Sequence, residues 1–426
     1  MYNAKEVYCT QTMKIHLFTS QKDAKMKILL TIEDISFGRG AERVTVNLAN
    51  AFAERRHKVS ILSFYQRHPT LPYTNINPQV KLSFKYNYEQ SMAQESAKKQ
   101  FFKGFYYKNI HKILLSYGMR KADYDFIVSS GFIYFPYFKN PKTKYIKIIH
   151  TSFQRYSSRN KYFDILITLS NKELPLWRQY HKNVQMIPNF IPQIPQKCTN
   201  HKQKVIISVG SLTAEKGFLR LLDIWKMVQD RIKLPHPKSL PQGEGLDFDS
   251  PSIAYSKSKT SPSPAEGDKG GGFDSQNLTA WKLVIVGDGI MKSQIESKIK
   301  ALGLQDSIIL KPFTKDIEKE YLSASIYAMS SHWEGFPMVL LEACSYGLPC
   351  IAFDIATGPS DIIEHSKSGF LISDDDLEAY ANHLLKLMSD ESMRERFGVE
   401  AKRIVGERFS KEVIMWEWEK LFSDKS

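Results

Sequence analysis

The chain has 426 residues, of which 42% are hydrophobic and 24% charged, and a formal net charge of +14. This length exceeds a single ordinary core and favours two domains, and the composition is that of a globular protein rather than a disordered one. No apolar run of about 18 residues occurs, which excludes a transmembrane helix. The positive charge suggests an anionic partner: nucleic acid, anionic lipid or a phosphorylated substrate.

Residues 1–25 carry charge on both sides of a very short apolar piece and make a poor signal peptide. Because the strand-like MKILLTIED begins at Met26, we interpret residues 1–25 as an N-terminal extension, which a misplaced start codon would explain. The four cysteines lack metal or redox spacing, and two lie in segments that we expect to be buried. These features predict reduced thiols and a cytoplasmic protein.

Short apolar strands alternate with helical stretches along most of the chain. KILLTIED is followed by a helical stretch at about 41–55 and then by HKVSILSFY, YDFIVSS, KYIKIIH and FDILITLS. After a proline-rich crossover at 186–196 the alternation restarts with KVIISVGS, WKLVIVGDG, SIILKPF, IYAMSS and CIAFD. This pattern predicts an α/β protein with two Rossmann-like, doubly wound parallel-sheet domains facing a cleft. We expect an N-terminal domain over 26–197, a C-terminal domain over 198–405, and a helix over 406–426 that packs back toward the N-terminal domain.

Two segments stand outside this pattern. Residues 97–121 hold seven Lys and Arg residues and no acid, interleaved with aromatic residues. Such a helix suits the surface of an anionic membrane, but a packed helix with a solvated basic face explains it equally well, and both interpretations remain open. No RNA-binding sheet signature or basic zipper occurs, so we expect no nucleic-acid partner.

Residues 233–278 are rich in Pro, Gly, Ser and charge, which predicts a disordered insertion without a catalytic role. Within this segment, LPQGEG and PSPAEGDKGGG look like the arms of a translated palindromic repeat. Deletion of 235–277 should therefore leave activity largely intact.

The stretch HWEGFPMVLLEACSYGLPCIAFD, residues 332–354, places Glu334 and Glu342 around a Gly-Phe-Pro turn that precedes a helix. Proline suits the start of a helix, where free amides can meet a phosphate or sugar hydroxyls. Carboxylates repel phosphate, but their two oxygens can bridge a vicinal diol. Taken alone, the stretch also fits a surface helix with two solvated glutamates. The amides concerned are those of Phe336, Met338 and Val339.

Further candidates lie at strand ends and in the turns that follow them, where ligands bind in open α/β sheets. FGRGAERV (37–44) is a glycine turn before a helix, and VGSLTAEKGF (209–218) sets Lys216 in a glycine-flanked loop. His150 ends the strand KYIKIIH, and the Gly-Pro turn of ATGPSDIIEHSKSGFLI (356–372) opens a short helix. Each is weak alone, since loop lysines, strand-end histidines and glycines before helices are usually structural. VGDG lacks the third glycine of a dinucleotide fingerprint, because Lys292 stands there.

Together these segments resemble the retaining nucleotide-sugar glycosyltransferases of the GT-B fold, family four of the sequence-based classification (glycosyl transferases group 1). The resemblance covers nearly all of 204–372 apart from the insertion. It lies in VGSLTAEKGF, LVIVGDG, HWEGFPMVLLEA with its Glu-x7-Glu pair, GLPCIAFD and GPSDIIEHSKSGFLI. The first half matches more loosely, through GRGAERVTVNLANAFAERRHKVSIL, the strand-end His150 and the crossover MIPNF.

The resemblance implies a role for each matching residue. Glu342 would hold the donor ribose, and Glu334 with the backbone of residues 335–337 would hold the transferred sugar. Lys216 would contact the diphosphate together with a backbone amide of Gly40, and His150 would lie near the reacting sugar on the acceptor side. The implied catalytic residues are Glu334, Lys216 and His150, and the implied donor-binding residues are Gly40, Gly210, Ser211, Lys216, Gly335, Phe336, Pro337, Met338, Val339 and Glu342.

This chain departs from the family pattern at two positions. Ser211 stands where many members carry an arginine, so either another cation takes up the phosphate charge or Lys216 carries more of it. Arg39 replaces the first glycine of a common Gly-Gly turn.

The implied reaction displaces a nucleoside diphosphate from the anomeric carbon with retained configuration, using no metal and no cofactor. The wording GPSDII is most similar to bacterial surface-polysaccharide enzymes that use UDP-hexoses, which implies a lipopolysaccharide, lipooligosaccharide or capsule acceptor. An anionic or lipid-linked glycan would place the protein peripherally on the cytoplasmic face of the inner membrane. A dehydrogenase is disfavoured by Lys292, while a nucleotide-sugar epimerase, a pyridoxal-phosphate phosphorylase and a non-catalytic membrane scaffold remain alternatives.

Overall fold

A computed structural model of the chain describes residues 25–38, 40–72, 75–91, 110–233 and 278–423. All but the last residue of the expected N-terminal extension lies outside the described residues, as does the predicted insertion apart from its two end residues. The basic segment 97–121 is described from residue 110 onward.

The first sheet has seven parallel strands in the order β3-β2-β1-β4-β5-β6-β7. Its central strands are predominantly apolar because helices and loops cover both faces, as parallel sheets require. In α1 the apolar residues Val44, Leu48 and Phe52 recur every four positions and pack into the core. The strands are β1 (Lys27–Asp34), β2 (Lys58–Tyr65), β3 (Lys81–Phe84), β4 (Phe126–Ser129), β5 (Lys144–Ile148), β6 (Ile165–Thr168) and β7 (Val184–Met186), and the helices are α1 (Gly40–Glu54), α4 (His111–Met119) and α5 (Leu174–Arg178).

The second sheet has six parallel strands in the order β10-β9-β8-β11-β12-β13. The predicted class, two Rossmann-like parallel sheets, is therefore confirmed. The strands are β8 (Val205–Val209), β9 (Lys282–Val286), β10 (Ile308–Lys311), β11 (Ile326–Met329), β12 (Cys350–Asp354) and β13 (Gly369–Ser373). The helices are α6 (Phe218–Lys233), α8 (Lys292–Ala301), α9 (Ile317–Leu322), α10 (Met338–Ser345), α11 (Pro359–Ile362), α12 (Leu377–Ser389) and α13 (Glu391–Arg408).

Each sheet reverses its strand order once, between β1 and β4 in the first domain and between β8 and β11 in the second. Ligands of open α/β sheets bind at the carboxyl ends of the strands beside such a switch point. The sequence candidates lie at these places: Lys216 follows β8, Glu334 follows β11, and Gly40 follows β1.

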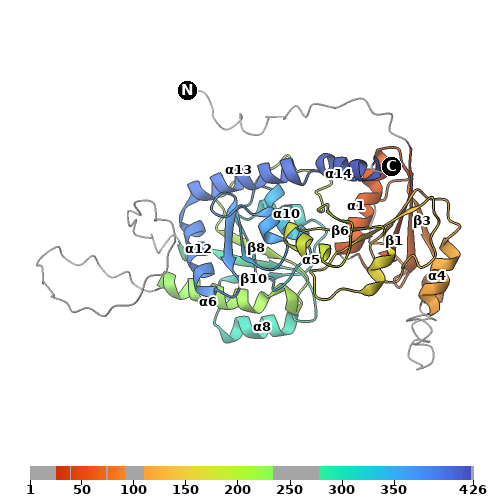
Figure 1. The fold of residues 1–426 in the computed structure, drawn as a ribbon. Coiled ribbons are helices and arrows are strands. Elements are labelled where there is room, and N and C mark those ends of the chain that lie inside the picture. The colour runs from red at the N-terminus through yellow and green to blue at the C-terminus, as the bar shows by residue number, and fades with distance from the viewer. Residues whose placement is uncertain (1–24, 39, 73–74, 92–109, 234–277, 424–426) are drawn as a thin grey trace, which may run out of the picture.

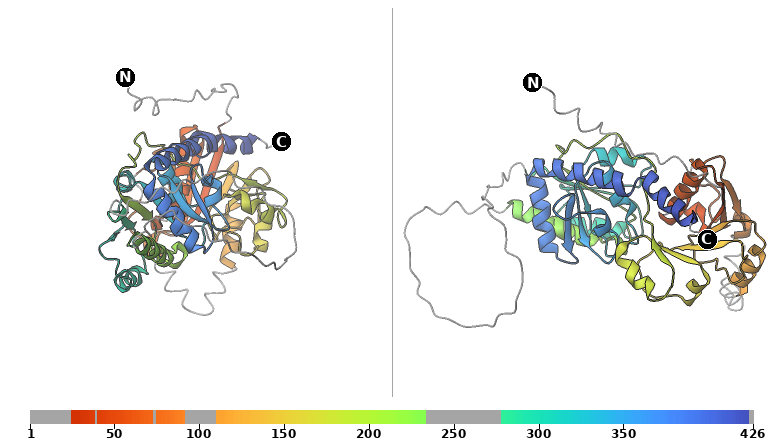
Figure 2. Two further views of the ribbon diagram at one scale, coloured as in Figure 1. Left: turned by 90° about the vertical axis from the view of Figure 1, so that its left-hand side faces the viewer. Right: turned by 45° about the horizontal axis from the view of Figure 1, so that its top comes forward.

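The last two helices connect the domains. Figure 1 shows α13 running along the second domain and the chain continuing into α14 (Lys411–Ser423), which reaches the first domain beside α1. The right-hand view of Figure 2 shows the same passage from another direction. The interdomain crossover meets this junction, since the Ile191 amide donates to the Phe409 carbonyl at 2.9 Å. Within the described part of the chain, no helix has both the length and the hydropathy that a membrane span needs.

Candidate functional site

Lys216 and Glu334 form an ion pair at the switch point of the second sheet. The Lys216 ammonium donates to both carboxylate oxygens of Glu334, at 2.7 and 2.8 Å. The Ser331 hydroxyl also donates to Glu334, at 2.7 Å. The Glu334 side chain is 8% exposed and that of Lys216 is 22% exposed, so both groups are held in place and still reach solvent. The structure thus brings together two of the three predicted catalytic residues.

The two loops that carry this pair are interlocked. Gly217 adopts a left-handed backbone conformation (φ +64°), and a Cβ there would lie 1.9 Å from the Ser330 carbonyl oxygen. The buried Arg220 donates to the carbonyls of Ser330 and Ser331 and pairs with acidic residues after β13. Glycine and arginine therefore fix the loop after β8 against the loop after β11, which sets the position of Lys216.

Glu342 lies on α10, the helix that follows Glu334 in the chain, and its side chain is 18% exposed. Its carboxylate pairs with the Arg43 guanidinium at 2.7 Å and accepts a hydrogen bond from the Tyr321 hydroxyl at 3.3 Å. Burial raises the pKa of Glu342, while the Arg43 charge and the Tyr321 hydrogen bond act in the opposite direction. Arg43 belongs to the first domain, so this ion pair crosses the domain boundary.

The turn before α10 is packed tightly. Pro337 is the residue that precedes the helix, rather than part of its first turn, and no side chain caps the helix there. Gly358 (φ +98°) leaves room for Pro337, because a Cβ at residue 358 would lie 2.4 Å from the Pro337 Cδ atom. Phe336 is buried against Phe409 with ring centroids 5.7 Å apart. Met338 and Val339, whose amides we expect to be free, open the helix.

Gly210 and Ser211 form the turn directly after β8. Ser211 is exposed, and its hydroxyl lies 3.5 Å from that of Thr213. A Cβ at Gly287 would lie 1.9 Å from the Gly210 carbonyl oxygen, and one at Gly289 would lie 2.4 Å from the Leu212 carbonyl oxygen. The glycines of VGDG are therefore explained by close packing against the turn after β8.

His150 and Gly335 meet across the domain boundary, since a Cβ at Gly335 would lie 1.9 Å from the His150 carbonyl oxygen. The His150 Nε2 atom is buried and has no hydrogen-bond partner among the described residues. Burial, and then the charge of Lys147, lower the pKa of His150 to about 3. The imidazole is thus neutral at physiological pH.

Gly40 is the first residue of α1, and no atom of the described residues, apart from its chain neighbours and its own helix, lies within 4 Å of the Cβ position it lacks. The open space beside it is compatible with a ligand at the start of α1. Three residues later, Arg43 projects from the first turn onto Glu342. Arg43 was not among the predicted site residues, although it lies within the segment GRGAERV. No sequence pattern pointed to it, because its partner is about 300 residues away.

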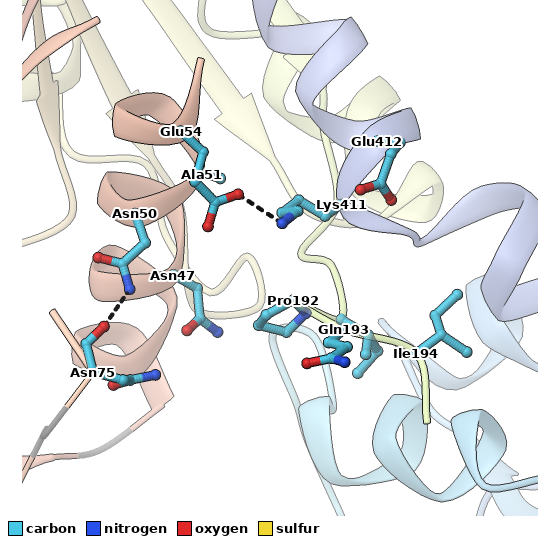
Figure 3. Close-up of a pocket in the computed structure, with 11 residues that line it drawn as sticks. Asn47, Asn50, Ala51, Glu54, Asn75, Pro192, Gln193, Ile194, Lys411 and Glu412 are labelled. Carbon is cyan, nitrogen blue, oxygen red and sulfur yellow. Dashed lines mark hydrogen bonds and ion pairs between the residues drawn. The ribbon is translucent and has the colours of Figure 1, made fainter. Parts of the chain in front are cut away.

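A cavity among the described residues lies apart from this site. Figure 3 shows this cavity, of about 470 Å³, where the later turns of α1 face the crossover at 191–194 and the start of α14. Its walls include the Glu54–Lys411 ion pair and the hydrogen bond from the Asn50 amide to the Asn75 carbonyl. It contains none of the predicted site residues. No group of three or more His, Cys, Asp and Glu side chains suited to a metal ion occurs in the described ranges.

A known family matches part of the second half of the chain. Residues 273–404 match the family described as glycosyl transferases group 1. An uncharacterized glycosyltransferase of Haemophilus influenzae is 26% identical over 407 residues, which cover 92% of this chain and 98% of the relative. The amylovoran biosynthesis glycosyltransferase AmsD of Erwinia amylovora is 25% identical, with the same two coverages.

The fold is shared with solved glycosyltransferase structures. A point mutant of Staphylococcus aureus TarM, crystallised with fondaparinux, α-GlcNAc-glycerol and UDP, aligns with a TM-score of 0.67 at 16% identity. The alignment covers 93% of this chain and all of TarM. The resemblance to group 1 glycosyltransferases and the GT-B fold is therefore confirmed.

Proposed function

We propose that this chain, which carries a glycosyl transferases group 1 domain on a GT-B fold, is a retaining hexosyltransferase. It would move a hexose or N-acetylhexosamine from a UDP-sugar to a growing bacterial surface glycan: lipopolysaccharide, lipooligosaccharide or capsule. The observation that carries this proposal is the Lys216–Glu334 pair at the switch point, with Glu342 on the next helix. The UDP in the TarM structure and the biosynthetic role in the name AmsD support the donor and acceptor classes.

The site supplies the groups that such a transfer needs. Lys216, the open amides of α10 and the Gly40 amide would meet the negative charge of the leaving diphosphate. The carboxylates of Glu334 and Glu342 would accept hydrogen bonds from hydroxyls of the transferred sugar and of the ribose. The bond from the anomeric carbon to the phosphate oxygen breaks, the bond to the acceptor oxygen forms on the same face, and the acceptor proton passes to the leaving diphosphate. In this reaction neither a metal nor a cofactor is needed.

His150 would act through its neutral imidazole. Because the pKa of His150 is lowered to about 3, the ring carries no charge at physiological pH and can donate or accept one hydrogen bond. Its position against Gly335 lies beside the turn that would hold the transferred sugar. We therefore assign His150 to sugar binding on the acceptor side.

A thermal-shift panel of UDP-, GDP- and ADP-sugars tests the donor, since a specific ligand raises the melting temperature by mass action. We expect a shift with UDP-sugars, and Lys216→Ala and Glu342→Ala should each reduce transfer by about 100-fold or more. Lys226→Ala, which removes an exposed ion pair on α6, is the matched control. Wild-type rates in both site variants would refute the assignment, and an inverted linkage in the product NMR spectrum would refute retention.

The same assays separate the alternatives. An epimerase converts the nucleotide sugar without an acceptor, and a phosphorylase requires pyridoxal phosphate and inorganic phosphate. A non-catalytic scaffold consumes no donor under any of these conditions. Donor turnover that depends on an added glycan acceptor supports the transferase alone.

We also propose that the protein acts peripherally at an anionic membrane. On α4 and the loop it contacts, Ile113, Leu114, Tyr117 and Phe132 are 45–61% exposed, although they are large and apolar. Arg120 lies over the Tyr117 ring, so cationic groups accompany this apolar surface. Cosedimentation with phosphatidylglycerol vesicles should exceed that with phosphatidylcholine vesicles, and Leu114→Glu should abolish the difference. Equal recovery with both vesicle types would contradict membrane attachment.

A further inference from the structure

Arg43 lies at the domain boundary, beside the proposed donor site. It projects from the first turn of α1, which begins at the switch point of the first sheet, and its guanidinium is 2.7 Å from the Glu342 carboxylate in the second domain. The Arg43 side chain is 39% exposed, so part of it faces solvent. An arginine at this boundary can exchange its partner without repacking a core.

Both carboxylates assigned to the donor have cationic partners in the structure. Glu334 is paired with Lys216 through two hydrogen bonds, and Glu342 is paired with Arg43. If ribose hydroxyls bind Glu342, they compete with Arg43 for the same oxygens. Arg43 then loses its partner at the moment when a diphosphate arrives beside it.

The diphosphate needs more positive charge than Lys216 supplies alone. Ser211, exposed in the turn after β8, provides no positive charge. Lys216 is also shared with Glu334. A guanidinium suits a phosphate better than an ammonium does, because its fork can donate two parallel hydrogen bonds.

We propose that Arg43 is the second cation of the donor diphosphate site: it rests on Glu342 without donor and transfers to the phosphates when the ribose takes over Glu342. This inference rests on the proposed function and assigns Arg43 the phosphate contact that Ser211 cannot make. The two domains thereby share the donor, since Lys216 comes from one and Arg43 from the other. Arg43 also connects donor binding to domain closure.

Calorimetric titration with two probes, UDP and uridine, tests the exchange. Arg43→Gln should weaken UDP binding by about tenfold or more, the loss of one charged hydrogen-bond pair. The same variant should bind uridine as well as wild type or more tightly, because Glu342 no longer has to be released by Arg43. Arg43→Lys keeps the charge without the fork and should bind UDP with an affinity between those of wild type and Arg43→Gln.

Arg55→Gln is the matched control, since Arg55 follows the other end of α1 and pairs with Glu419 on α14. It should change neither titration. Equal UDP binding by wild type and Arg43→Gln overturns the inference, and so does an equal loss for UDP and uridine, which a merely structural arginine would give. Failure of wild type to bind UDP overturns the proposed donor and the inference with it.

Discussion

Lys147 lies on β5 with its ammonium group enclosed, and the residue is 2% exposed. The ammonium donates to the Gly131 carbonyl and lies 4.9 Å from the centroid of the Phe132 ring. Burial, and then the charge of Lys112, lower the pKa of Lys147 to about 7, against an opposing effect of Glu33. In the folded protein, the surroundings of Lys147 therefore strongly disfavour the charged form of its amine.

Lys147→Met should stabilise the protein in a pH-dependent way. The pKa is about 7 in the folded state and roughly 10.4 in the unfolded state, so the cost of the charge grows as pH falls from about 10 to 7. Near pH 7 that cost is about 4 kcal/mol, and losing the hydrogen bond and ring contact offsets roughly 1–2 kcal/mol of it. Melting temperatures should thus rise in the variant at pH 7 and converge with wild type near pH 10.

Lys144→Met, at an exposed position of the same strand, controls for general effects of the substitution. It should change stability by less than about 0.5 kcal/mol at any pH. A gap between Lys147→Met and wild type that stays constant from pH 7 to pH 10 would show that the Lys147 amine does not titrate in the fold.

At the scale of single residues, the sequence predicted which residues belong to the site better than it predicted which of them contact one another. The motifs placed Lys216 and Glu334 in one site, and the structure has them in direct contact. That contact and the Arg43–Glu342 pair could not be foreseen, because the partners lie about 120 and about 300 residues apart in the sequence. Lys147 lies in a strand that the sequence predicted, but its burial depends on a loop that follows β4.

At the scale of elements, the strands that sequence patterns missed are β3, β7 and β13, and all three lie at sheet edges. β3 (KLSF) and β7 (VQM) are short and mix polar with apolar residues, so neither forms an apolar run or a clear alternation. The central strands were predicted, since burial on both faces makes them rich in apolar residues. These edge strands are held by pairing with a neighbouring strand, which the local sequence pattern does not show.

Helix α14 is an element whose role follows from packing. Phe422 is 1% exposed, and its ring centroid lies 4.2 Å from that of Phe126 and 5.3 Å from that of Phe52. Phe126 begins β4 and Phe52 lies on α1, so the last turn of α14 fills the core of the first domain. The packing of α14 therefore contributes to the stability of the first domain.

Phe422→Ala should destabilise the protein by about 3–5 kcal/mol, the usual cost of removing a buried phenylalanine ring. Trp416→Ala is the control on the same helix, because Trp416 is 59% exposed and should change stability by less than about 0.5 kcal/mol. Urea unfolding followed by circular dichroism measures both. Similar losses in the two variants would show that α14 does not complete this core.

At the scale of the whole molecule, contacts between the domains surround the candidate site. Arg43 meets Glu342 on one side, and Lys172 pairs with Asp354 at 2.6 Å on another. The Asn171 amide, next to Lys172, donates to Asp361 at 3.0 Å. The structure is therefore a closed arrangement in which polar contacts join the strand ends of the two domains. Such contacts can be broken and remade as a donor enters.

Closure depends on the absence of a side chain at Gly335. A Cβ there would lie 1.9 Å from the His150 carbonyl oxygen and 3.2 Å from the Thr151 Cα atom, both in the backbone of the other domain. Because backbone cannot rotate away like a side chain, Gly335→Ala should hold the domains apart while each one stays folded. We expect kcat to fall by about 100-fold or more, since displacements near 1 Å already have such effects, and small-angle scattering to show a larger radius of gyration. Gly118→Ala, which has no atom within 4 Å of the new methyl, should match wild type in both measurements; an active, equally compact Gly335→Ala enzyme would show that this contact does not limit closure.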